Sequence, residues 1–118
     1  ERQVSSLATA LGLSHIPLNR VKCMRSSGSK SRRTLARIHT LSQPLQKGLA
    51  LPPHYVIEVI SENFDSLPEE EKTKTLIHEL LHIPRSFQGG FRHHRPHVTR
   101  KTVENAYRAL KGGIYGAP

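Results

Sequence analysis

Residues 78–82 read His-Glu-Leu-Leu-His, and this short pattern constrains the chain more than any other part of its sequence. On an α-helix, residues four positions apart lie one above the other on the same face. His78 and His82 can therefore bind one metal ion, and Glu79 lies close enough to them to handle a proton. The pattern predicts a helix at this point and a metal site on its surface.

Signals on both sides of this pattern predict where the helix begins and ends. Ser66 and Glu69 have the Ser-x-x-Glu spacing of a capping box, and acidic residues fill the expected first turn. Pro84 ends the helix, because a residue that precedes proline disfavours the α conformation. We therefore expect a helix over about residues 67–82. Its buried face comprises Leu76, Ile77, Leu80 and Leu81.

The rest of the chain predicts a small α+β fold. Helical spacing of apolar residues indicates two more helices, over residues 4–13 and 99–110. Alternating apolar residues indicate three strands, over residues 15–24, 34–41 and 55–60. Polar stretches rich in glycine, serine or proline indicate loops, over residues 25–33, 42–54 and 85–98. We expect the first two strands to pair as a hairpin, and the strand over residues 55–60 to lie in the core.

Size and composition limit the class of protein. A chain of 118 residues can form one core, so we expect a single domain over residues 1–118. No apolar run approaches the length of about 20 residues that a membrane span needs, so no membrane partner is expected. Cys23 is the only cysteine, which excludes a disulfide framework and a cysteine-based zinc site. An intracellular, cytoplasmic location is the default expectation.

Positive charge is concentrated in the first half of the chain. The net charge is +9, and no acidic residue occurs from Arg2 to Ile57, against nine Lys and Arg. Such a basic half could bind nucleic acid or another polyanion. The alternative is a solvated basic surface without a specific partner.

The metal site needs a third ligand from further along the chain. Catalytic zinc usually has three protein ligands and one position open to water. His78 and His82 supply two ligands, and we predict His94 as the third. Gly89-Gly90 allows the chain to reverse after the helix and return a ligand to it. Three other residues are alternative third ligands: His93, His97 and Glu104.

A site built from imidazoles and a carboxylate suits one catalytic zinc ion per chain, although nickel or copper are chemical alternatives. Zinc lowers the pKa of its bound water to roughly 7 and polarises a substrate carbonyl. Glu79 would accept the proton of that water and pass it to the leaving amine. Candidates for stabilising the oxyanion are Tyr107, Tyr115 and His97.

Residues 78–94 read His-Glu-Leu-Leu-His-Ile-Pro-Arg-Ser-Phe-Gln-Gly-Gly-Phe-Arg-His-His. This segment resembles a family of small metallopeptidases from phages and archaea, in which HExxH-Ile-Pro precedes Phe-x-Gly-Gly and a single His. The resemblance implies zinc ligands at His78, His82 and His94, and a catalytic acid at Glu79. It also implies a zincin-like fold, with a twisted, mostly antiparallel sheet packed on the motif helix. His93 beside His94 departs from the family pattern.

These features favour a zinc-dependent metallopeptidase that acts on a peptide or protein. The strand over residues 55–60 could serve as a sheet edge to which an extended substrate adds. The alternative is a non-enzymatic zinc-binding or nucleic-acid-associated module on a zincin scaffold. A looser similarity to SprT-like proteases makes a DNA-associated protease a variant of this hypothesis. A third hypothesis is a nucleic-acid binder whose histidines are incidental.

Overall fold

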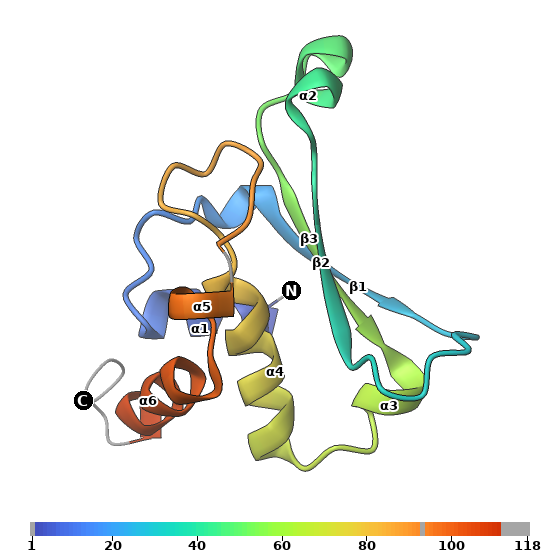
Figure 1. Ribbon diagram of the computed structural model, residues 1–118, viewed down its shortest axis with the longest axis vertical. Coiled ribbons are helices and arrows are strands. Elements are labelled where there is room, and N and C mark those ends of the chain that lie inside the picture. Colours follow the sequence, from blue (N-terminus) through green and yellow to red (C-terminus); the bar gives the residue numbers. More distant parts are fainter. Residues whose placement is uncertain (1, 93, 112–118) are drawn as a thin grey trace.

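The computed structural model describes residues 2–92 and 94–111 and has a three-stranded sheet with helices on one side of it (Figure 1). The strands are β1 (Val21–Ser26), β2 (Ala36–Thr40) and β3 (Tyr55–Ile60). The helices are α1 (Arg2–Ala10), α2 (Gln43–Leu49), α3 (Ser61–Phe64), α4 (Glu69–Leu81), α5 (His94–His97) and α6 (Arg100–Lys111). Helices α1, α4, α5 and α6 share one side of the sheet, and α2 and α3 lie at its two ends (Figure 1). The fold is α+β, as the sequence predicts.

Strand β3 lies in the middle of the sheet, between β1 and β2. It runs parallel to β1, with Val21 opposite Tyr55, and antiparallel to β2, with Ile38 opposite Ile57. The predicted hairpin between the first two strands is therefore wrong, and the sheet is mixed rather than mostly antiparallel. The connection over residues 27–35 carries the chain from β1 to the far side of β3.

Burial explains why β3 takes the central position. Tyr55, Ile57 and Ile60 are 0 % exposed, whereas β2 has no buried residue and β1 has one, Val21. The most apolar strand gains most from neighbours on both sides, because they exclude water from its backbone and side chains. Since β1 and β2 occupy both of its edges, residues 55–60 cannot serve as the sheet edge for a peptide.

The sheet has one buried face and one open face, as expected when successive side chains alternate in direction. Tyr55 and Ile57 belong to the main core together with Leu80 of α4. The open face carries polar groups, and His39 Nε2 lies 2.8 Å from Glu58 Oε1. The helices that bear on function therefore lie on the buried face.

A second, smaller core joins α4 to the other helices. Ile77, which is 0 % exposed, packs with Leu11 after α1 and with Val103 of α6. Helix α4 is thus held by the sheet through Leu80 and by its neighbouring helices through Ile77. Burial of each such side chain contributes about 1.5–3 kcal/mol to the free energy of folding, so α4 holds the residues on its surface in fixed positions.

Helix α4 begins at Glu69 instead of residue 67, and the predicted capping box does not form. Pro68 is the N-cap and offers no side-chain hydrogen bond, whereas Ser66 Oγ donates to the Asn63 carbonyl at 3.5 Å. Ser66 thus belongs to the turn that ends the preceding short helix α3, and its hydroxyl does not cap α4. The first turn of α4 is acidic, as expected, and contains Glu69, Glu70 and Glu71. Negative side chains at this end stabilise the helix by interacting with the positive end of its dipole.

The segment over residues 42–54 is not mostly loop, because it contains α2. Ser42 caps this helix by accepting a hydrogen bond from the Leu45 amide at 3.4 Å, and Pro44 fits its first turn. Ala50 ends it in the left-handed conformation. The sequence signal for this helix is Ser42 followed two residues later by Pro44.

Smaller differences occur at the boundaries of other predicted elements. The first strand is shifted to Val21–Ser26, because Leu18–Arg20 forms a short 3-10 turn, η1. Helix α5 lies within the predicted irregular segment over residues 85–98. Over residues 2–92 and 94–111, no helix has both the length and the apolar character needed to cross a membrane.

Candidate metal centre

Helix α4 and its C-cap bring His78, Glu79 and His82 to one surface. Helical spacing places the two imidazoles one turn apart, and their Nε2 atoms lie 3.3 Å from each other. Glu79 and His82 are buried, at 7 % and 8 % exposure, and His78 is half-buried. The helix therefore supplies two neighbouring ring nitrogens and a buried carboxyl beside them.

The backbone of Arg92 orients the ring of His82. His82 Nδ1 lies 2.9 Å from the Arg92 carbonyl oxygen, and the Arg92 amide donates to the His82 carbonyl at 2.8 Å. When Nδ1–H donates to a carbonyl, the neutral ring presents Nε2 as an unprotonated ligand atom. This nitrogen is the one that faces His78, so the tautomer suits metal binding.

His94, the first residue of α5, lies beside His78 and His82. Its ring centroid lies 5.5 Å from that of His78 and 4.7 Å from that of His82. One possible ligand atom from each of the three histidines lies within 4.8 Å of the others. The structure thus brings together the three histidines that the sequence singles out, and ligation by them stays a prediction.

The loop before α5 is anchored by Tyr55, which the sequence indicates only as a core residue. Its hydroxyl donates to the Gly90 carbonyl at 2.7 Å. The same oxygen accepts from the amides of Gly89 and Gly90 at 3.2 and 3.1 Å. The ring packs edge-on against Phe87 and Phe91, with centroids 4.9 and 5.9 Å away. A buried tyrosine hydroxyl needs polar partners, and the Gly-Gly segment supplies them.

Gly89 lets this loop approach the rest of the molecule closely. Its φ is +97°, and a Cβ atom there would lie 2.5 Å from both the Leu41 carbonyl oxygen and Gln46 Nε2. Gln46 Nε2 donates to the carbonyls of Leu41 and Gln88 at 2.9 and 3.0 Å. Helix α2, which carries Gln46, therefore helps to hold the loop that leads to the third histidine.

None of the alternative residues that the structure describes belongs to the group of three histidines. Glu104 Oε1 lies 2.8 Å from Lys74 Nζ, and the Tyr107 hydroxyl lies 3.5 Å from Glu70 Oε1. His97 is exposed and is not part of the histidine group found among the described residues. Two further candidates lie outside the described residues: His93 and Tyr115.

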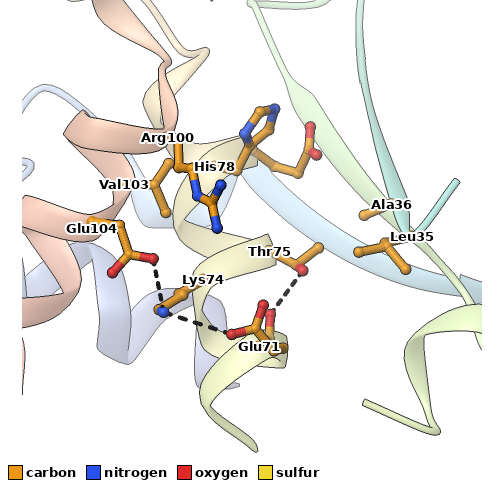
Figure 2. A pocket seen from close by; sticks show the side chains of 10 residues that line it. Leu35, Ala36, Glu71, Lys74, Thr75, His78, Arg100, Val103 and Glu104 are labelled. Atoms are coloured by element: carbon orange, nitrogen blue, oxygen red, sulfur yellow. Dashed lines mark hydrogen bonds and ion pairs between the residues drawn. The ribbon is translucent and has the colours of Figure 1, made fainter. Parts of the chain in front are cut away.

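A pocket of about 510 Å³ opens beside His78 and Glu79. Its walls come from α4, from α6, and from Leu35 and Ala36 at the start of β2 (Figure 2). The buried carboxyl is therefore reachable from a space large enough for part of a peptide.

Two of the three imidazoles already have the spacing of zinc ligands. Nitrogens that bind zinc at about 2.0–2.1 Å in tetrahedral geometry lie about 3.3–3.4 Å apart. The Nε2 atoms of His78 and His82 are already separated by 3.3 Å. A donor set of three histidines, without cysteine, is typical of catalytic rather than structural zinc.

Burial shifts the pKa values of the groups at this centre. Burial, reinforced by the charges of His82 and His94, lowers the pKa of His78 to about 4. Burial also lowers the pKa of His82, although the hydrogen bond to the Arg92 carbonyl acts in the opposite direction. Burial raises the pKa of Glu79 to about 7, and this carboxyl has no hydrogen bond or ion pair with another described residue. Neutral imidazoles are ready to bind metal, and the carboxyl can exchange a proton near neutral pH.

The basic N-terminal half is partly neutralised by acidic residues of β3 and the segment after it. Arg25 pairs with Asp65, and Arg37 lies 3.9 Å from Glu58. These contacts reduce the charge that the first half of the chain offers to a polyanion. They give no support to nucleic-acid binding.

A small sheet packed on a helix that carries HExxH, with a third histidine returned by the following loop, is the arrangement of a small zincin-like protein. Over residues 1–107 the chain matches the family model described as "Putative phage metallopeptidase", and it belongs to that family. The matched region includes α4, the anchored loop and His94. The resemblance indicated by residues 78–94 is confirmed. The chain shows no match to a curated protein or to a solved structure.

Tyr55→Phe should destabilise the protein by about 1–3 kcal/mol, because the amides of Gly89 and Gly90 lose their acceptor. Denaturant unfolding measures the loss, and hydrogen exchange should accelerate at these two amides. Tyr107→Phe is the matched control, since its hydroxyl makes only an exposed contact of 3.5 Å with Glu70. Unchanged protection of the two glycine amides in Tyr55→Phe would contradict the anchoring role.

The raised pKa of Glu79 predicts a pH-dependent effect of Glu79→Gln on the metal-free protein. The carboxyl keeps its proton up to about pH 7 when folded but only to about 4.5 when unfolded. Its contribution to stability is therefore lost as the pH rises through this window, and the neutral amide escapes the loss. Relative to wild type, the variant should gain about 2 kcal/mol more at pH 8 than at pH 5. Urea unfolding in the presence of a chelator measures this difference, and a pH-independent difference would rule out the raised pKa.

Proposed function

We propose that this chain is a zinc-dependent metallopeptidase, with one zinc ion held by His78, His82 and His94. The observation that carries the proposal is the convergence of three histidine ligand atoms within 4.8 Å, with Glu79 buried next to them. Membership of a metallopeptidase family supports hydrolysis of a peptide or protein substrate. The single cysteine favours an intracellular site of action.

Glu79 is the residue of this site that moves a proton. A zinc ion bound by three imidazoles supplies a Lewis acid that polarises the substrate carbonyl and lowers the pKa of a water molecule. Glu79 accepts the proton of the attacking water and then gives it to the leaving amine. In the metal-free protein burial raises the pKa of Glu79 to about 7. The positive charge of a bound zinc ion would lower this pKa again, so the carboxylate would be ready to accept the proton.

Strand β2 is the part of the sheet best placed to align a peptide. It is an edge strand, and Leu35 and Ala36 at its start line the pocket that contains His78 and Glu79. An extended peptide adds to such an edge through backbone hydrogen bonds. In this proposal β2 takes the role that the sequence suggested for residues 55–60.

A non-enzymatic zinc-binding module explains Glu79 less well. Zinc storage or structural stabilisation gains nothing from placing a mostly buried carboxyl at the pocket beside the histidines, and its loss of water costs stability. Carboxyls with strongly raised pKa values cluster at sites where protons are transferred. A nucleic-acid-associated variant, including a DNA-associated protease, has no specific contact in its favour.

The purified protein should retain about one zinc ion per chain through gel filtration, as elemental analysis can measure. His94→Ala should weaken zinc binding by more than the about 10- to 100-fold typical of losing a partner outside the coordination sphere. His97→Ala is the control and should bind zinc as wild type does. If His97→Ala or Glu104→Ala abolished binding while His94→Ala did not, the ligand set would have to change.

Glu79→Gln should bind zinc normally and lose at least about 10²-fold in hydrolysis, because the amide cannot accept the proton of the water. The assay uses casein and a mixture of internally quenched peptides, with zinc content measured on the same samples. A chelator should abolish wild-type hydrolysis, and added zinc should restore it. Wild-type rates in Glu79→Gln would exclude Glu79 as the base.

A further inference from the structure

The pocket beside Glu79 contains side chains of both charges (Figure 2). Besides His78 and Glu79, its lining from the two helices comprises Glu71, Lys74, Thr75, Arg100, Val103 and Glu104. Because the pocket reaches Glu79, a peptide whose scissile bond lies at that carboxyl places a neighbouring side chain in it. The charges of the pocket therefore bear on which side chain is accepted.

Lys74 is already neutralised by carboxylates. Its Nζ atom lies 2.8 Å from Glu104 Oε1, 2.9 Å from Glu70 Oε2 and 3.6 Å from Glu71 Oε2. Hydrogen bonds to Glu104 and Glu70 raise the pKa of Lys74, and the bond from Lys74 is the main reason why the pKa of Glu104 is lowered. Lys74 is thus fully engaged by these carboxylates and is not free for a ligand, and the carboxylates keep an excess of negative charge that Lys74 does not neutralise.

Arg100 differs from Lys74, because it makes no hydrogen bond or ion pair with another described residue. It is exposed, and its charge has the smallest influence among those that lower the pKa of Glu104. In Figure 2, Arg100 extends from α6 into the pocket, between Glu104 and His78. Its guanidinium is therefore available to a ligand that lies close to the metal centre.

The position of Arg100 in α6 also favours an anionic ligand. It is the first residue of the helix, and the first turn contains no acidic residue. Thr99 and Thr102 cap this end, with Thr102 N donating to Thr99 Oγ1 at 3.1 Å and Thr99 N to Thr102 Oγ1 at 2.8 Å. Helix formation does not need Arg100, and the helix dipole disfavours a cation there. A carboxylate in the pocket would relieve this repulsion and pair with the guanidinium.

The geometry points to Arg100 as a specificity residue that binds an aspartate or glutamate side chain of the substrate, adjacent to the cleaved bond. Guanidinium and carboxylate form two parallel hydrogen bonds, a geometry that an amide or an ammonium side chain cannot reproduce. This inference rests on the proposed peptidase function and adds to it a substrate class. The preferred substrates are peptides with an acidic residue next to the scissile bond.

Cleavage of matched peptides tests this specificity. Zinc-loaded protein is assayed with internally quenched, C-terminally amidated peptides that carry Glu, Gln or Lys at one position on either side of the cleaved bond. At one of these positions, kcat/KM should be about 10- to 100-fold higher for Glu than for Gln. Arg100→Gln should remove this preference by slowing the Glu peptide far more than the Gln peptide, and Arg100→Glu should turn it toward Lys. Lys101→Gln is the matched control, because it removes a charge one residue away outside the pocket lining, and it should keep the preference.

Binding distinguishes a failure of this inference from a failure of the peptidase proposal. Fluorescein-labelled Glu and Gln peptides are titrated into zinc-loaded Glu79→Gln protein, and anisotropy should show tighter binding of the Glu peptide. Adding Arg100→Gln should equalise the two affinities. If the wild type cleaves no peptide but this binding preference is observed, the peptidase proposal fails and the role of Arg100 stands. Equal binding of both peptides, or equal slowing of all peptides by Arg100→Gln, overturns the inference.

Discussion

The hydroxyl group of Tyr55 joins two parts of the molecule that belong to different layers. The ring belongs to the central strand of the sheet, and the three backbone groups that the hydroxyl binds belong to the loop after α4. The same loop carries Arg92, whose carbonyl directs the ring of His82, and it ends where His94 begins α5. The geometry of the histidines thus depends on a residue that touches none of them. Outer partners of this kind commonly determine how well ligands are oriented.

The histidine pair could be predicted from the sequence because its geometry is local. Four residues span about one helical turn, and the helix itself places His78 above His82. The return of His94 followed from the Gly-Gly reversal and from the family resemblance. The anchoring role of Tyr55 could not be predicted, because the partners of its hydroxyl lie 34 and 35 residues away along the chain. The sequence of an apolar strand does not indicate which distant backbone groups a hydroxyl will bind. The proposed role of Arg100 could not be predicted from the sequence either. The sequence does not show that the carboxylates near the pocket contact Lys74 and not Arg100.

The sheet order could not be read from the sequence for a related reason. Strands that follow each other along the chain usually pair, and this tendency favoured a hairpin over the first two strands. Here the stability gained by placing the most apolar strand between two neighbours outweighs the advantage of pairing β1 and β2 through a short connection. Residues 55–60 therefore separate β1 from β2. The missing capping box has a local cause, because Ser66 is recruited by the end of α3 before it can cap α4. Patterns over a few residues therefore predicted which elements exist better than how they meet.

The exposed edge of β2 carries a risk of self-association as well as an opportunity. An unpaired strand offers its backbone to any extended segment, including the same strand of another copy, and such pairing is a route to aggregation. In this chain the edge is only five residues long and carries the exposed side chains of Arg37 and His39. With a net charge of +9, two copies repel each other as they approach along this edge. The molecule can thus leave a strand open beside its candidate metal centre while discouraging the assembly of copies into fibres.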